Sequence, residues 1–235
     1  MDADDYYVGL NVPTGRMLGS EFAELATLAR EIGDGEVRLT LNQNVLLPSI
    51  SEVTVSELRG ESLRERYSPD PGPFTRGVVT CTGNEFCSCG IIETESRAIR
   101  WARRLDDWAD GQWDGPPDAI RLHLSGCSAS CAQSQIADIR LRSETYRDET
   151  AGEREAVDVG LGGDLGRETF IDWVAGEVPV ETIPDAVKRL TTTYVNERET
   201  LISPGRRTHQ AGRGLPGESR YCPPCVRRPR DAYRR

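Results

Sequence analysis

Residues 81–87 read CTGNEFC, and residues 126–131 read GCSASC. Five residues separate Cys81 from Cys87, and three separate Cys127 from Cys131. Four thiolates are the usual complement of a [4Fe–4S] cluster. A structural zinc site more often shows two short spacings or histidine partners. The spacing therefore favours an iron–sulfur cluster over a zinc site and over buried thiols that bind nothing.

Each cysteine pair follows a segment that reads as a short strand. RGVVTC leads into the first pair, and AIRLHL runs directly into the second. Gly83, Gly90 and Gly126 would let the backbone bend closely around a bulky inorganic core. Further strands are expected in IADIRLR and AVDVGL, with helices before and after them. We predict a mixed α/β domain over residues 74–199, with both cysteine pairs at strand ends.

The sequence before this domain indicates a smaller unit over residues 1–68. VGLNV is strand-like, and Ser20 can cap a helix that Gly33 and Gly35 end. Residues 37–41 alternate apolar with polar side chains, as in a half-buried strand, and VLLPSI is the next strand. A polar helix is expected over residues 51–67. This order predicts a small α+β unit, close to half of a ferredoxin-like fold.

Composition limits the class of protein. The net charge is −9, and Lys188 is the single lysine, so nucleic acid and membrane surfaces are not expected partners. No run of 18 apolar residues predicts a membrane span, and the first residues lack a signal-peptide pattern. We therefore expect a cytoplasmic protein. The seven cysteines then point to metal or redox chemistry more than to structural disulfides.

Two long motifs resemble a known family. CTGNEFCSCGIIETESRA and IRLHLSGCSASCAQSQIADI are similar to the cluster region of sirohaem-dependent assimilatory nitrite reductases and their sulfite reductase relatives. The resemblance implies that Cys81, Cys87, Cys127 and Cys131 bind one [4Fe–4S] cluster. It also implies that Cys131 bridges to the sirohaem iron. The CTGN-x-FC form looks more like the nitrite-reducing branch.

Weaker similarities extend the resemblance over about residues 7–199. TLNQNVLLPSI resembles a repeated family segment with a basic residue before the glutamine, where Asn42 stands here. VGLGGDLG, with Gly162 and Gly163, resembles a glycine loop near the tetrapyrrole, although an ordinary tight turn explains it equally well. Arg38, Arg121 and His123 lie on polar strand faces and could pair with sirohaem carboxylates. A solvated sheet face, and for His123 a surface histidine, is the simpler interpretation.

The resemblance implies a fold class and an activity. We expect an α+β chain, a ferredoxin-like half-domain followed by a sirohaem/[4Fe–4S] domain. Such a chain would belong to an oxidoreductase that reduces nitrite to ammonia, or sulfite to sulfide, with six electrons from a ferredoxin-type donor. The residues that grip the substrate anion are expected in an N-terminal half outside this sequence, so the chain alone should be inactive. A non-catalytic or degenerate iron–sulfur protein, or a relative in cobalamin ring synthesis, is the alternative.

Several residues depart from the pattern or read as ordinary structure. Cys89 is expected to be a packing residue that points away from the cluster. Arg140, Ser143 and Ser134 stand where glycines and a proline are expected, and Arg140 could crowd its neighbours. The helix after Cys89 should carry a solvated polar face. Its charged residues are Glu93, Glu95 and Arg97. Residues 200–235, which include the CPPC of Cys222 and Cys225, predict a disordered tail.

Overall fold

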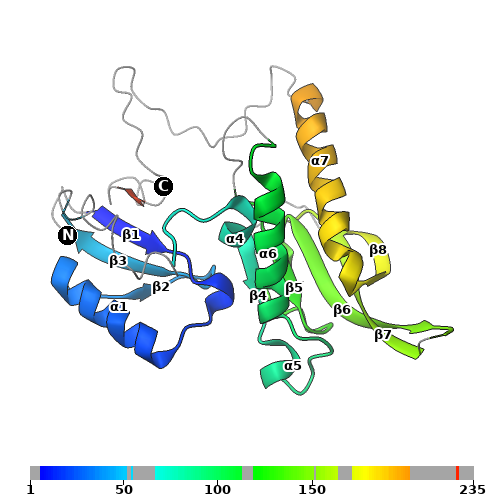
Figure 1. The fold of residues 1–235 in the computed structure, drawn as a ribbon, viewed down its shortest axis with the longest axis horizontal. Helices are drawn as coiled ribbons and strands as arrows, with labels where there is room; N and C mark the ends of the chain where they lie inside the picture. The colour runs from blue at the N-terminus through cyan, green and yellow to red at the C-terminus, as the bar shows by residue number, and fades with distance from the viewer. Residues whose placement is uncertain are drawn as a thin grey trace.

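The structure is a computed structural model that describes residues 6–51, 54, 67–112, 119–150, 152–163, 171–201 and 226–227. Its strands form two separate sheets, each with its own helices (Figure 1). Each sheet has its own cluster of buried apolar side chains. The two units expected from the sequence are therefore present as two cores.

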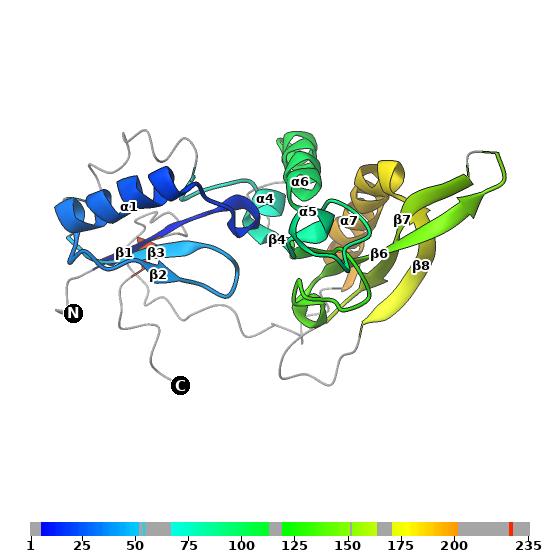
Figure 2. The same ribbon diagram turned by 90° about the horizontal axis from the view of Figure 1, so that it is seen from below.

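The first unit is a small antiparallel sheet covered by one long helix. The sheet has the order β2-β3-β1-β9, and the helix α1 lies along it in both ribbon views (Figures 1 and 2). Leu25 and Ala29 of α1 pack on β1 and β3. The bounds are β1 Tyr6–Leu10, α1 Gly19–Ile32, β2 Arg38–Leu39, β3 Val45–Ile50 and β9 Val226–Arg227, with a 3₁₀ turn at Pro13–Gly15.

Two details of this unit differ from the sequence expectation. Ser20 lies inside the first turn of α1, and the backbone N–H of Leu18 instead donates to the Glu21 carboxylate at 2.8 Å. The strand expected over residues 37–41 shrinks to the two residues of β2. Leu39 and Leu41 are 75% and 84% exposed. The half-buried strand was thus wrong, because no part of the described chain covers these leucines.

The second unit is a mixed sheet with helices on one face. The order is β4-β5-β6-β7-β8; β4, β5 and β6 run parallel, and β7 and β8 follow antiparallel. The strands are β4 Val78–Thr80, β5 Leu122–Ser125, β6 Ile139–Asp148, β7 Gly152–Leu161 and β8 Asp172–Pro179. The helices are α4 Pro73–Gly77, α5 Gly83–Phe86, α6 Glu95–Ala109 and α7 Ile183–Leu201, with 3₁₀ turns at Ser134–Ile136 and Val180–Thr182.

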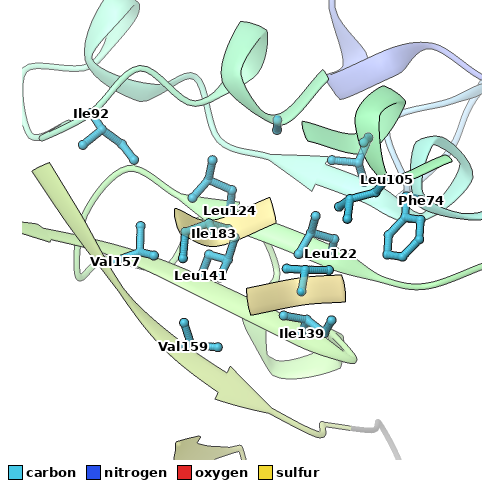
Figure 3. Packing of buried hydrophobic residues seen from close by; sticks show 14 of the residues in the cluster. Phe74, Ile92, Leu105, Leu122, Leu124, Ile139, Leu141, Val157, Val159 and Ile183 are labelled. Carbon is cyan, nitrogen blue, oxygen red and sulfur yellow. The ribbon is translucent and has the colours of Figure 1, made fainter. Parts of the chain in front are cut away.

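Burial of one sheet face holds this unit together. Leu122, Leu124 and Leu141 point toward α6 and α7 and are almost fully buried (Figure 3). Leu105 of α6 and Ile183 of α7 close the same cluster. Each such side chain contributes about 2 kcal/mol by leaving water. The expected strands and helices are confirmed, and α4, α5 and β8 are additions that the sequence did not predict.

Some expectations fall on residues that the structure does not describe. They include residues 52–53 and 55–66 of the expected polar helix, in which Thr54 is helical and Ser51 and Tyr67 are not, and they include the Cys222–Cys225 motif. In the tail, α7 runs on to Leu201, and Val226–Arg227 pairs antiparallel with β1. The domain bounds and the disorder of residues 200–235 stay predictions. Among the described residues, no helix is long and apolar enough to cross a membrane.

Candidate functional site

The two cysteine pairs begin at the same edge of the second sheet. Cys81 directly follows β4, and Cys127 follows β5 after Gly126. Because β4 and β5 are parallel neighbours, with Thr80 opposite Leu124, their chain ends meet at one edge. The backbone N–H of Cys81 donates to the Leu124 carbonyl at 3.3 Å. The sequence expectation that both pairs lie at strand ends is therefore confirmed.

All four cysteines of the two motifs line one cavity. Its volume is about 640 Å³, and Cys81, Cys87, Cys127 and Cys131 are all on its wall. Cys87 and Cys131 are exposed, and Cys81 and Cys127 are half-buried. Cys89 is exposed and is not among the residues lining the cavity. Its expected packing role was wrong, although it does lie away from the other four.

The opposite wall of the cavity comes from the first unit. This wall is mostly apolar, with polar groups from the turn before β3. Its main members are Met17, Phe22, Leu39, Thr40, Gln43 and Val45. Of the ionisable side chains on the whole lining, apart from the cysteines, Glu95 is the sole one among the described residues. The cavity thus joins four thiols on one side to an apolar surface on the other.

Hydrogen bonds and glycines fix the cysteine loops. The Gly126 N–H donates to Cys81 Sγ at 3.1 Å, and the Thr94 hydroxyl donates to the Cys81 carbonyl at 2.5 Å. Gly83 has φ +61°, and a Cβ there would lie 2.7 Å from Thr94 Oγ1. Glycine is therefore required at this position by both backbone conformation and space. The bend that the sequence suggested at Gly83 is therefore present, and it packs against Thr94.

The thiols are not arranged around a single metal ion. Within the described part of the chain, no three Cys, His, Asp or Glu side chains come close enough to hold one ion. In a [4Fe–4S] cluster each thiolate binds a different iron, so the ligands stand around a larger core. A mononuclear zinc site needs its ligands to converge on one point. The described residues therefore show no preformed site for a single metal ion.

An ion-pair network joins the first unit to the loop between Cys81 and Cys87. Arg16 donates to both oxygens of Glu85, at 2.8 and 3.1 Å, and to Glu95 at 3.1 Å. Its guanidinium also lies 5.1 Å from the Phe86 ring centre. Burial raises the pKa of Glu95, and Arg16 opposes that effect. The solvated face expected for Glu95 was wrong, since this side chain is buried beside the cavity.

Three of the residues suggested for sirohaem binding are not part of the cavity lining. Arg38 pairs with Glu36 at 2.7 Å, and Arg121 pairs with Asp138 at 2.6 Å. Asn42 is exposed, and none of the three lines the cavity. A role for Arg38, Asn42 or Arg121 in holding sirohaem stays a prediction.

The glycine loop packs against the chain that follows the second cysteine pair. Gly162 and Gly163 have φ +77° and +142°. A Cβ on Gly163 would lie 2.4 Å from the Gln135 carbonyl oxygen. Close packing therefore requires glycine at 163, whichever ligand lies nearby. Residues 164–170 of the motif lie outside the described residues.

Arg140 and Ser143, which stand where glycines were expected, are accommodated by their neighbours. The Arg140 guanidinium lies 4.4 Å from the centre of the Trp173 ring and also donates to the Ser130 hydroxyl. Ser143 is buried and donates to the Ser125 carbonyl at 2.7 Å. Both side chains thus contact the strand end and loop of the second cysteine pair. Neither departure disrupts the sheet.

His123 is buried, which contradicts the surface position expected for it. It is 1% exposed, and Nδ1 lies 3.1 Å from the Gln133 carbonyl oxygen. The prediction failed because the loop after Cys131 covers this face of β5, which local alternation cannot show. Burial lowers the pKa of His123, and Arg121 lowers it further, while Asp138 and the backbone raise it.

Acid should destabilise the fold through His123. Its folded-state pKa is depressed, so its contribution is present above about pH 6.5, the ordinary value, and is lost as pH falls toward the folded value. Uptake of one proton gives a slope of at most about 1.4 kcal/mol per pH unit. Urea unfolding between pH 5 and 8 should show a smaller acid loss for His123→Gln than for the wild type. Equal pH dependence in the two proteins would contradict this assignment.

Sequence reasoning missed several residues that build the site. Gln43 and Thr94 hold the residues around Cys81, and Arg16 and Glu95 connect the two units. Gln43 and Thr94 lie within the motifs that carried the resemblance. The signal was therefore present for these two. Arg16 and Glu95 meet across 79 positions of sequence, and no local pattern indicates such a pair.

The family model and the curated proteins that match this chain all carry the name of nitrite or sulfite reductases. Residues 1–63 match the family model described as nitrite/sulfite reductase ferredoxin-like half domain. The assimilatory ferredoxin-dependent nitrite reductase of Haloferax mediterranei is 38% identical over 197 residues, which are 82% of this chain and 33% of the relative. The ferredoxin–nitrite reductase of Synechococcus elongatus is 41% identical over 186 residues, 78% of this chain and 35% of the relative.

Solved structures show the same fold. The Mycobacterium tuberculosis NirA protein aligns with a TM-score of 0.74 and 27% identity, over 86% of this chain and 36% of that one. Dissimilatory sulfite reductase I aligns with a TM-score of 0.63 at 12% identity, over 82% of this chain and 62% of that one, which shows the fold alone. The chain spans about a third of the length of the curated relatives it matches. It belongs to the nitrite/sulfite reductase family.

Proposed function

We propose that this chain is the part of a ferredoxin-dependent assimilatory nitrite reductase that holds the [4Fe–4S] cluster and the sirohaem. One observation carries the proposal: Cys81, Cys87, Cys127 and Cys131 line a single cavity although the two pairs lie far apart in the sequence. The names of the relatives support nitrite as substrate and ferredoxin as donor.

The residues present fit both groups. Four thiols supply the usual ligand set of a [4Fe–4S] cluster, and the Gly126 N–H already donates to Cys81 Sγ. The apolar wall with Met17, Phe22 and Leu39 suits the flat face of a macrocycle. Leu39 is 75% exposed, and covering it with the apolar face of the macrocycle would remove that surface from water.

The chemistry explains why two cofactors are required. Nitrite becomes ammonia by gaining six electrons, and protein side chains cannot supply them, so the bound cluster and sirohaem provide the electron path. The contribution of this chain is to hold the thiolates and shape the cavity. We assign Cys131 as the thiolate shared by both centres on the resemblance of its motif, and its exposed position on the cavity wall, which Cys87 shares, is compatible with that role.

The anionic groups would need cations from outside the described lining of the cavity. Apart from the cysteines, Glu95 is the sole ionisable side chain on the described lining, and buried carboxylates need paired cations to offset desolvation. We propose that an N-terminal half, on the same or a separate chain, supplies the cations for sirohaem and nitrite. The exposed Phe22, Leu39 and Leu41 would be covered in that assembly. We place the assembly in the cytoplasm.

The assignment predicts one magnetically coupled centre. The chain reconstituted with iron and sulfide, and then mixed with sirohaem and the N-terminal half, should show exchange coupling between haem and cluster in Mössbauer and electron paramagnetic resonance spectra. In Cys131→Ser the coupling should disappear, because the shared thiolate is lost. Independent haem and cluster signals in the wild-type protein would rule out the bridge.

A further inference from the structure

The turn at residues 40–44 lies between the two cysteine loops and contacts both. Its own hydrogen bonds fix its shape: the Thr40 N–H donates to the Asn44 carbonyl at 2.9 Å, and the Asn44 N–H donates to the Thr40 hydroxyl at 3.1 Å. Gln43 has φ +61°, in the left-handed region. A non-glycine residue held there costs free energy, so the surrounding contacts must favour this conformation.

The Gln43 side-chain amide makes two hydrogen bonds to the backbone of Thr80, one to its carbonyl and one from its N–H. Its Nε2 donates to the Thr80 carbonyl at 2.7 Å, and its Oε1 accepts from the Thr80 N–H at 3.2 Å. Thr80 is the last residue of β4, and β4 is the edge strand of the second sheet. The amide therefore takes the place of a missing neighbouring strand, one residue before Cys81.

A second glutamine links the other cysteine loop to the same turn. The Nε2 of Gln133, two residues after Cys131, donates to the Leu41 carbonyl at 2.7 Å. The carbonyl of Gln133 lies 3.1 Å from His123 Nδ1 on β5. Residues 41 and 43 of one turn thus hold both flanks of the cysteine cavity. The turn belongs to the first unit, whereas all four cysteines belong to the second.

Gly15 leaves the space that Gln43 needs. A Cβ on Gly15 would lie 2.9 Å from the Cβ of Gln43, and Gly15 has φ +74°. Alanine at position 15 would therefore push Gln43 away while its amide stays chemically intact. This gives two independent ways to disturb the contact with Thr80.

We propose that Gln43 is a positioning residue for the cluster: by holding Thr80 it sets the place of Cys81 Sγ relative to the Gly126 N–H and to the second cysteine pair. The proposal rests on the cluster site proposed above. Hydrogen bonds to ligand sulfur help to set the reduction potential of a cluster. An N–H near sulfur favours the more negative, reduced state, so weakening the 3.1 Å contact should lower the potential.

The first test uses the cluster-free full chain and needs no activity. Alkylation by iodoacetamide is followed by mass spectrometry on separate cysteine peptides. In Gln43→Leu, Cys81 should react about tenfold faster than in the wild type, because two hydrogen bonds next to it are lost. Gly15→Ala should change the Cys81 rate in the same direction. The exposed Cys89 is the internal reference and should keep its rate.

The second test uses the chain reconstituted with iron and sulfide. Gln43→Leu should have a lower midpoint potential than the wild type and lose iron faster to a chelator, and Gly15→Ala should follow it. Gln112→Leu, at an exposed glutamine just after α6, is the matched control and should behave as wild type. Wild-type Cys81 alkylation and potential in both Gln43→Leu and Gly15→Ala would overturn the positioning role. Failure of the wild type to bind iron would instead overturn the cluster site, while the alkylation rates still test Gln43.

Discussion

Serine in place of Cys81, Cys87, Cys127 or Cys131 should lower iron incorporation by about tenfold or more. Each of these thiolates is proposed to bind its own iron, and a serine hydroxyl is a poor substitute for a thiolate at neutral pH. The effect should be large for all four because they line the same cavity from two loops. Iron and sulfide analysis after anaerobic reconstitution, together with the charge-transfer absorption of the cluster, measures it.

Cys89→Ser is the matched control for this series. Cys89 is two residues after Cys87 and is exposed, but it does not line the cavity. Its replacement should leave iron content unchanged, as should replacement of Cys222 or Cys225. A Cys127→Ser protein that keeps its full iron content would contradict the ligand assignment. Loss of iron in Cys89→Ser would show that the ligand set was chosen wrongly.

The predictable parts of the site are those that depend only on residues close together in the sequence. The spacing of Cys81 and Cys87, and the strands that precede both pairs, needed only local alternation and glycine placement. Two parallel neighbouring strands then bring the pairs to one edge, since chain ends of parallel strands share an edge. The cavity follows from these local features together with the docking of the first unit.

The failures share one physical cause, which is cover by distant chain. His123 alternates with Leu122 and Leu124 and shares a strand face with Arg121, as if exposed, yet the loop after Cys131 buries it. Glu95 reads as part of a solvated face, yet Arg16 and the cavity wall enclose it. The prediction for Leu39 failed in the opposite direction: it was expected to be half-buried, but nothing in the described chain covers it. Alternation reports which face a side chain is on, but burial depends on what lies against that face.

The isolated chain should not reduce nitrite over many turnovers, even when sirohaem is supplied. Nitrite and the sirohaem carboxylates are anions, and the described cavity lining offers them no arginine, lysine or histidine. Arg16, which stands between the lining residues Gly15 and Met17, is already engaged by Glu85 and Glu95. Without a positive pocket, the anion would meet the iron with no group to hold it or to stabilise developing charge.

The measurement is ammonia production driven by a reduced viologen dye. The isolated chain should give less than about 1% of the rate of an intact relative, since losing even one charge-stabilising donor costs about 10²-fold or more. Adding the part of the Haloferax mediterranei relative that this chain does not match, expressed as a separate N-terminal chain, should restore part of the rate. Heat-denatured N-terminal chain is the control and should restore none.

The two possible failures of this experiment have different meanings. Robust turnover by the isolated chain would show that cations outside the described lining reach the substrate, and would overturn the need for a second half. Binding of cluster and sirohaem without turnover after adding the N-terminal half would instead point to a non-catalytic iron–sulfur protein. An increase in sirohaem binding together with turnover is the expected result. It would show that carboxylate pairing and substrate binding depend on the same added cations, because both sets of anions face a cavity whose described lining carries no positive side chain.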